Sequence, residues 1–391
     1  MIEKVFSELD AIFPETVSLR RFFHQYPELS FQEEKTPAKI LEYLNDLGIK
    51  TRTMVGGRGV VGIIQGEQPG KTVAIRADFD ALPIQDEKQV PYRSKIPGVM
   101  HACGHDAHTA LLLSVAKALQ TYRGHIKGNI VLIHQFAEEV PPGGALPMIE
   151  DGCLDGVDAI FGTHLWTPIP VGKIAIRKGP IMAAADNFTA VIKGKGGHGG
   201  QPHETIDPIL IAANYLQLLQ QIPSRSINPV ESAVISVGSF HAGETFNVIP
   251  DQAVIKGTVR TFKPEIQNLI IEQMETLLRT LCLAKKADYE FRYEKGYPPV
   301  VNHSKETELA AACAKKVVGI ENVFETDPLM VGEDFSYYLQ KVPGTFFLTG
   351  AGNPEKLASF PHHHAKFDID ERAMLYAAKV LAAAAIQYLQ N

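Results

Sequence analysis

The chain has few cysteines, and no two of them lie close together in the sequence. Its 391 residues contain four, Cys103, Cys153, Cys282 and Cys313, without a Cys-x-x-Cys pair. Disulfide frameworks belong to small oxidised proteins with closely spaced cysteines, whereas scattered thiols are typical of a reducing compartment. The scarcity argues against a disulfide scaffold, and we expect reduced thiols in a cytoplasmic protein.

Long apolar runs and an excess of positive charge are also missing. No window reaches eighteen apolar residues; the alanine-rich end at 377–389 is interrupted by Lys379 and Gln387 and predicts a terminal helix. Residues 1–6 lack the basic start and the apolar run of a signal peptide. A net charge of -6 offers no electrostatic footprint for nucleic acid or an anionic membrane, so we expect partners of neither kind.

The order of the predicted elements indicates an α/β fold. A chain of this length exceeds the size at which one core usually stops growing, so two domains are expected. Apolar patterns predict helices over 3–25, 37–47 (capped by Thr36) and 107–119, and buried strands over 59–64, 71–77, 128–136 and 158–163. After residue 307 a helix, a strand at 345–349 and the terminal helix complete this first domain, which we expect to hold a mixed sheet between helices.

A second pattern interrupts the first domain. It consists of strands at 187–193, 232–240, 253–262 and 289–293, with helices at 206–222 and 264–283. The order strand, helix, two strands, helix, strand is that of a ferredoxin-like α+β fold. We therefore predict a first domain in two parts, 1–184 and 296–391, and an inserted domain over 185–295.

Acidic and histidine side chains follow three of the predicted strands. Asp78 and Asp80 come after the strand at 71–77, Glu138 and Glu139 after the strand at 128–136, and His164 after the strand at 158–163. In open α/β sheets, sites are built where the strands end. These side chains are therefore predicted to converge.

Two further clusters carry typical metal ligands. One is the run from His101 to His108, in which Cys103 and His105 are two residues apart, and the other is the triple histidine at 362–364. One ligand from each cluster gives Cys103, His105, Glu139, His164 and one of the three histidines. Five ligands, one of them bridging, suit two tetrahedral ions that share a hydroxide. A single structural zinc would need only four ligands and would leave Glu138 without a purpose.

These motifs resemble those of a known family. Residues 76–83 (RADFDALP), 101–108, Ala137-Glu138-Glu139, 162–164 and 363–367 are similar in order and spacing to the amidohydrolase branch of the aminoacylase/carboxypeptidase-G metallopeptidases. The resemblance covers nearly the whole chain. It implies a metallopeptidase-type catalytic domain, an inserted lid and dimerisation domain, and hydrolysis of linear amides of N-acyl amino acids.

The resemblance also assigns roles to individual residues. It implies that Cys103, His105, Glu139, His164 and His363 bind two divalent ions, which we expect to be Mn²⁺, Zn²⁺, Co²⁺ or Ni²⁺. Glu138 matches the general base, Asp80 the acid that orients the metal site, and Asp78 a supporting position. Many members have His-x-Pro-x-Phe where this chain has His363-His364-Ala365-Lys366-Phe367, so His362 and His364 remain alternatives to His363.

The inserted domain is expected to hold the substrate. By the same resemblance, His198 stabilises the oxyanion, and Asn247 and Arg260 hold the substrate carboxylate, for which the planar fork of arginine is suited. Residues 194–199 formally match the dinucleotide motif GxGxxG, but Pro202 interrupts the following helix and no acidic residue lies about twenty positions on, so this alternative is weak. Glu333 and Asp334 are predicted to cap the start of a helix.

Several alternatives remain from the sequence alone. A dipeptidase or aminoacyl peptidase would use the same mechanism. A cysteine amidase would use Cys103 as nucleophile and His105 as base, but residues two apart do not easily face one another and two carboxylates would be unexplained. A metal-dependent binding or scaffold protein without catalysis would not need Glu138. The leading prediction is a cytoplasmic, homodimeric amidohydrolase acting on a small N-acyl amino acid.

Overall fold

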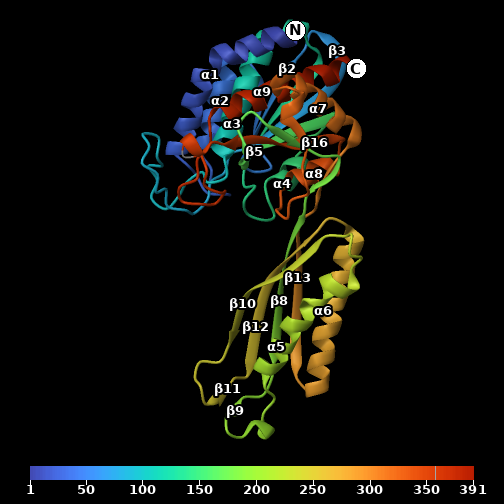
Figure 1. The fold of residues 1–391 in the computed structure, drawn as a ribbon. Coiled ribbons are helices and arrows are strands. Elements are labelled where there is room, and N and C mark those ends of the chain that lie inside the picture. The colour runs from blue at the N-terminus through green and yellow to red at the C-terminus, as the bar shows by residue number, and fades with distance from the viewer. Residues whose placement is uncertain (357) are drawn as a thin grey trace. The chain divides into compact units, whose positions relative to one another are not determined.

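The computed structural model describes residues 1–356 and 358–391, which form two compact units. The first unit comprises Met1–Ile181, Val300–Asp327 and Asp334–Asn391, and the second comprises Met182–Pro299 and Pro328–Glu333 (Figure 1). The second unit is thus inserted into the chain of the first. In the described part of the chain, no helix has the length and apolarity needed to cross a bilayer.

A mixed sheet of eight strands runs through the first unit, in the order β1-β2-β4-β3-β5-β16-β6-β15. Strands β4, β3, β5 and β16 pair in parallel, whereas β1, β2 and β6 join through antiparallel pairs. The strands are β1 (Lys50–Val55), β2 (Gly59–Gln65), β3 (Gln68–Asp78), β4 (Lys127–Gln135), β5 (Ala159–Pro170), β6 (Ile174–Ile176), β15 (Val323–Glu325) and β16 (Gly344–Gly352). The mixed α/β fold predicted from the sequence is confirmed.

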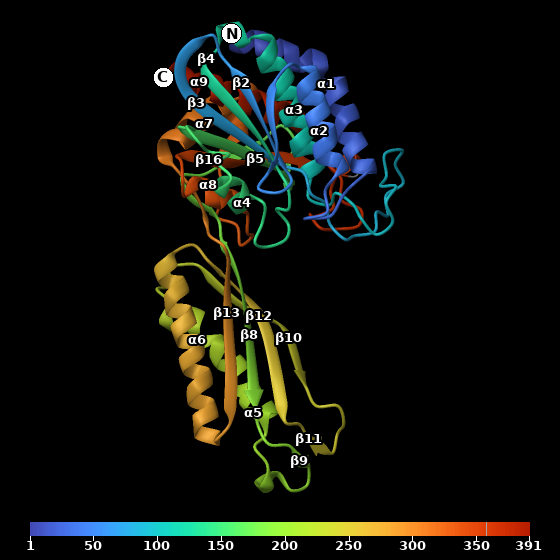
Figure 2. The same ribbon diagram turned by 180° about the vertical axis from the view of Figure 1, so that it is seen from behind.

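Helices pack on this sheet, as the two opposite views show (Figures 1 and 2). Helices α3 and α9 contact β3 and β5, α1 contacts both of these helices, and α2 contacts β1 and β2. Alanines of α9 are fully buried, because small side chains allow a close approach of the helix to the sheet. The helices are α1 (Ile2–Gln25), α2 (Lys35–Asp46), α3 (His105–Thr121), α4 (Ala145–Glu150), α7 (Ser304–Val318), α8 (Phe335–Leu339) and α9 (Arg372–Gln390).

The second unit has the predicted element order. Its antiparallel sheet runs β10-β12-β8-β13, and α5 and α6 pack against it, which is the strand order of a ferredoxin-like fold. The elements are β8 (Ala184–Lys193), α5 (Pro208–Leu219), β10 (Ala233–Ala242), β12 (Gln252–Thr261), α6 (Pro264–Lys285) and β13 (Asp288–Tyr297). A small sheet of the second unit pairs β9 (Gly197–His198) with β11 (Val248–Ile249). Another small sheet, which belongs to the first unit apart from Met182, pairs β7 (Gly179–Met182) with β14 (Val300–Asn302).

Both predicted helix caps are wrong in their chemistry. The N-terminal N–H groups of α2, including that of Thr36, donate to the carboxylate of Glu28 at 2.8 to 3.0 Å, so Thr36 is not the cap. Asp334 precedes α8 without a side-chain cap, because its carboxylate instead accepts hydrogen bonds from Arg76 and Gln135. In both cases a partner distant in sequence replaced the local interaction.

A buried ion network joins α1 to α3 and to the segment before α9. Arg20 is fully buried; its Nε donates to Asp106 at 2.8 Å and an Nη donates to Asp368 at 2.9 Å.

We expect Arg20→Leu to destabilise the protein by about 3–5 kcal/mol, because both buried carboxylates lose this cation. Arg21→Leu is the control, since Arg21 is 45% exposed and its pair with Glu371 should contribute ~1 kcal/mol or less. Denaturant midpoints of the two variants test this, and equal midpoints would contradict it.

Candidate metal centre and active site

The acids and the histidine that were predicted to converge lie at one edge of the sheet of the first unit, although His164 lies inside β5 rather than after its end. Asp78 ends β3 and pairs with Gln135 at the end of β4, and Glu138 and Glu139 follow three and four residues later. His164 lies on β5, which pairs with the other side of β3. The parallel pairing of β4, β3 and β5 therefore brings the acids and the histidine to one edge of the sheet.

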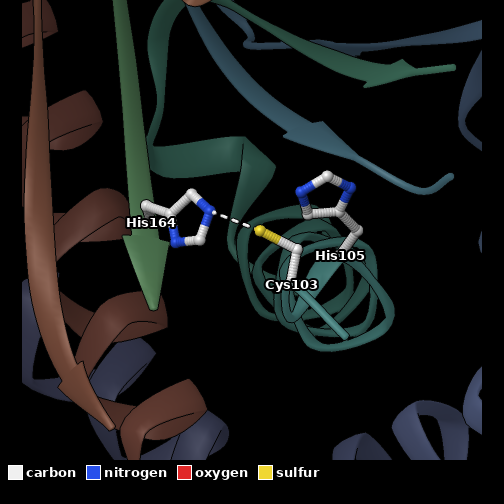
Figure 3. A group of neighbouring side chains, drawn as sticks. All are labelled: Cys103, His105 and His164. Carbon is white, nitrogen blue, oxygen red and sulfur yellow. Dashed lines mark hydrogen bonds between the residues drawn. The ribbon is translucent and has the colours of Figure 1, made fainter. Parts of the chain in front are cut away.

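Cys103 and His105 enter this edge from the start of α3. Figure 3 shows Cys103 directed at His164, with 3.4 Å between Sγ and Nε2, while His105 projects from the first residue of the helix. Gly104 lies between them at a φ of 94°, a left-handed conformation that favours glycine. The glycine therefore permits the turn before α3 that brings both the Cys103 thiol and the His105 imidazole to this edge of the sheet.

Of the five groups of side chains that have the arrangement of metal ligands among the described residues, three overlap at this edge and consist of the expected ligands and Glu138. Within each group, the potential ligand atoms lie within 4.8 Å of one another. The groups are Cys103 with His105 and His164, Cys103 with Glu139 and His363, and His105 with Glu138 and Glu139. Their shared members join the five ligands expected from the sequence, together with Glu138, into one cluster.

Two buried atoms in this cluster have no hydrogen-bond partner among the described residues. They are Nε2 of His105 and Oε1 of Glu139, which lie 3.9 Å apart. Nδ1 of His105 lies 2.9 Å from Oδ1 of Asp80, an arrangement typical of a metal-binding histidine, whose other nitrogen is held by a carboxylate. A buried polar atom without a partner costs folding free energy. A cation bound between His105 Nε2 and Glu139 Oε1 would give both atoms a partner, so their arrangement fits a metal site.

The electrostatics of the cluster also fit a cation. Burial disfavours the charged form of His105, but the carboxylates of Asp78 and Asp80 outweigh it and raise the pKa of His105 to about 10. Burial, assisted by Glu139 and Glu138, raises the pKa of the Cys103 thiol well above its usual value. Positive charge is therefore favoured here, and a bound divalent ion would lower the pKa of both groups by its own charge.

The three consecutive histidines have separate environments. His363 Nε2 lies 3.4 Å from Oε2 of Glu139, and the His363 N–H donates to Ala102 beside Cys103. His362 lies 3.0 Å from the carbonyl of Leu165 through Nε2 and stacks on Trp166. His364 stacks on Phe360 and accepts a hydrogen bond from the Lys366 N–H. Of the three, His363 is the one grouped with Cys103 and Glu139.

His108 and Asp78 lie beside the five proposed ligands and are held by hydrogen bonds. His108 has both nitrogens engaged, Nδ1 with Asp78 at 2.6 Å and Nε2 with the Leu165 N–H at 2.9 Å. Asp78 in turn accepts from Arg76, which also donates to Asp334. These bonds explain why Asp78 and His108 lie beside the cluster with their polar atoms already occupied.

Glu33 was not singled out from the sequence, yet it holds the segment that carries Glu138. Its Oε1 accepts a hydrogen bond of 2.9 Å from the N–H of Ala137, which has a left-handed φ of 51°. Burial, with a smaller contribution from Asp80, raises the pKa of Glu33 to about 8, so the group is mostly protonated at neutral pH. No local pattern in the sequence signals this contact, because Glu33 and Ala137 are 104 positions apart.

His198, Asn247 and Arg260 belong to the second unit. His198 lies on β9 opposite Val248 of β11, the residue after Asn247, and Gly199 donates to the Asn247 carbonyl at 2.8 Å. Arg260 lies on the interior strand β12, half-buried, and donates to the carbonyl oxygens of Asp186 and Val259. The structure thus brings His198 and Asn247 together, whereas the roles of all three toward a substrate stay predictions.

Comparison with known proteins agrees with this geometry. Residues 74–387 match the model of peptidase family M20/M25/M40. The protein YhaA of Bacillus subtilis (strain 168), which carries an amidohydrolase name, is 56% identical over 388 residues, 99% of this chain and 98% of its own. An N-acyl-L-amino acid amidohydrolase of Geobacillus stearothermophilus is 47% identical over 77% of this chain and 81% of its own.

A solved structure gives the same result. The crystal structure of the Bacillus subtilis YXEP protein, described as a dinuclear metal binding peptidase of the M20 family, has a TM-score of 0.85 at 36% identity and covers 98% of this chain and 99% of that chain. The resemblance stated from the motifs is confirmed. The chain belongs to peptidase family M20/M25/M40 and, within that family, to the metal-dependent amidohydrolases.

Proposed function

We propose that the chain hydrolyses the amide bond of N-acyl amino acids with two divalent ions held by Cys103, His105, Glu139, His164 and His363. The observation that carries this proposal is the pair of buried, unpartnered ligand atoms, His105 Nε2 and Glu139 Oε1 among the described residues, inside a cluster of five ligand-type side chains. Zn²⁺, Co²⁺ and Ni²⁺ suit a donor set of one thiolate and three imidazoles, and the carboxylate adds an oxygen ligand of the kind that Mn²⁺ prefers.

When bound, the divalent ions supply Lewis acidity, which polarises a carbonyl oxygen and lowers the pKa of water. Glu138 then acts as general base: it takes a proton from the attacking water, whose oxygen bonds to the acyl carbon. As the C–N bond breaks, Glu138 delivers that proton to the leaving amine nitrogen. Asp80 holds Nδ1 of His105, so Nε2 is directed toward Glu138 and Glu139, where it would be the atom that binds an ion.

The second unit is proposed to bind the rest of the substrate. His198 would donate to the oxygen that becomes negative, a role in which preorganised donors have large effects. Asn247 and Arg260 would hold the free carboxylate of the amino acid. We also propose a homodimer and a cytoplasmic location, the latter because all four cysteines are free and buried.

The choice among the three histidines can be tested by alanine variants. We expect His363→Ala to lower kcat/KM by at least about 100-fold and to reduce the bound metal. Mutating a residue that only supports a metal ligand already lowers metal affinity or activity 10–100-fold, and loss of a ligand should have a larger effect. His362→Ala and His364→Ala serve as matched controls and should retain the metal. Metal content of the three purified variants decides the question; a normal content in His363→Ala with loss in either neighbour would reassign the ligand.

The proposed function is tested by hydrolysis of an N-acyl amino acid panel, with the metal content measured on the same sample. We expect turnover of N-acyl amino acids that scales with bound metal, and little turnover of amides that lack a free carboxylate. Faster cleavage of dipeptides than of every N-acyl amino acid would favour a dipeptidase. No turnover of any substrate by fully metal-loaded protein would favour a binding protein.

A further inference from the structure

A cavity of about 740 Å³ lies in the first unit, among α2, the turn between β1 and β2, and the segment after β4. Most of its wall is apolar, and all of it comes from the catalytic unit. Its lining residues include Phe31, Leu41, Met54, Val60, Phe136 and Pro142. The cavity is large enough to take an acyl group well beyond acetyl in size.

The walls leave apolar surface exposed that the fold itself does not use. Met54 is 66% exposed and Phe31 is 37% exposed, and the Phe31 ring meets that of Phe136 edge to face with 5.9 Å between their centroids. Apolar side chains that are exposed singly are normal, whereas exposed apolar side chains grouped around one cavity indicate a binding surface. The pair of rings offers faces and edges on which an apolar group can pack.

The cavity and the proposed general base share one segment of the chain, although Glu138 itself is not among the lining residues. Phe136 lines the cavity and precedes Glu138 by two residues, while Pro142 and Gly143 line it a few residues after Glu139. Glu33, a further lining residue, holds Ala137, which directly precedes Glu138. The segment after β4, which carries Glu138 and Glu139, therefore also forms part of the cavity wall.

We propose that this cavity receives the acyl group of the substrate and makes the enzyme prefer large apolar acyl groups to acetyl. The inference rests on the proposed function, in which the amino acid carboxylate is held by residues of the second unit, so the cavity in the first unit is left for the acyl side. Each methylene moved from water into an apolar pocket favours binding by roughly fourfold. An octanoyl or benzoyl amide should therefore exceed the acetyl amide in kcat/KM by at least about tenfold.

The test compares N-acetyl-, N-octanoyl- and N-benzoyl-methionine with metal-loaded protein and three variants. Ala38→Trp fills the cavity from α2, and Met54→Asp places a charge on its wall, in a left-handed position that aspartate tolerates. Glu42→Trp adds the same bulk to α2 at a residue outside the lining. We expect the first two variants to reduce the octanoyl-to-acetyl and benzoyl-to-acetyl ratios of kcat/KM at least about tenfold, and Glu42→Trp to keep the wild-type ratios.

The outcomes separate this inference from the function on which it rests. If the wild type hydrolyses all three substrates without preferring the larger acyl groups, the cavity proposal is wrong and the proposed function stands. The same holds if the folded Ala38→Trp and Met54→Asp proteins keep the wild-type ratios. If metal-loaded wild type hydrolyses none of the three, the proposed function fails first, and the cavity proposal fails with it.

Discussion

Replacing Glu138 with glutamine should lower kcat by about 10²–10⁴-fold while both metal ions stay bound. Glutamine has nearly the shape of glutamate, but it cannot take a proton from water or return one to the leaving amine. The side chain is buried beside His105, with 4.0 Å between Oε2 and the imidazole Nε2, so the position is set by the fold rather than by solvent. Steady-state kinetics with metal analysis of the same protein measures the effect.

Glu139→Gln is the matched control for this prediction. Glu139 is the neighbouring carboxylate, its Oε1 is unpartnered among the described residues, and it is grouped with Cys103 and His363. We expect Glu139→Gln to lose metal and, for that reason, activity, and excess metal should restore part of the rate.

Full activity in Glu138→Gln with two ions bound would contradict the proposed mechanism, because no other group is assigned to move the proton.

Removing the divalent ions with a chelator should lower the rate by at least about a thousandfold. Loss of Lewis-acid stabilisation costs several kcal/mol of barrier, and each 1.36 kcal/mol corresponds to a factor of ten. Activity should return on adding Mn²⁺, Co²⁺, Ni²⁺ or Zn²⁺, and the rate should level off near two ions per chain. Activity assays paired with metal titration of the stripped protein give both quantities.

The same experiment separates the metal enzyme from a cysteine amidase. A Cys103 nucleophile would need a lowered pKa, whereas burial raises the pKa of this thiol. The imidazole within hydrogen-bond distance of Sγ is that of His164, at 3.4 Å, whereas the cysteine mechanism assigns the base to His105. Variants of Cys103 do not discriminate, since both mechanisms need the residue. A stripped protein that keeps its full rate and loses it on alkylation of Cys103 would favour the cysteine mechanism.

The site is held by contacts that span the whole first unit. His363 and Ala137 both have left-handed φ values although neither is glycine, 63° and 51° respectively. Such conformations persist where the surrounding structure imposes them. Here the N–H of His363 donates to the Ala102 carbonyl and that of Ala137 donates to Glu33, so two of the strained backbone positions lie at the proposed ligand His363 and directly before the proposed base Glu138.

The sequence by itself determined which residue types are available for the proposed chemistry. The spacing of Cys103 and His105, the Glu138-Glu139 pair after an apolar strand, and His164 in another apolar segment predicted the ligand types, because both periodicity and residue chemistry are local properties. The ferredoxin-like order of the second unit could also be predicted, since each of its elements has its own apolar pattern.

Only the tertiary structure decided which atoms meet. The three consecutive histidines are equivalent in sequence, and His363 is distinguished by its backbone bond to Ala102 and its approach to Glu139, across more than 200 residues of chain. The sequence predicted that Asp334 caps a helix, but in the structure its carboxylate accepts a hydrogen bond from Arg76 on the distant strand β3. The contact of Glu33 with Ala137 and the apolar cavity lined by Phe136 had no signal in the sequence, because contacts between remote segments depend on how the sheet and its helices pack rather than on any local pattern.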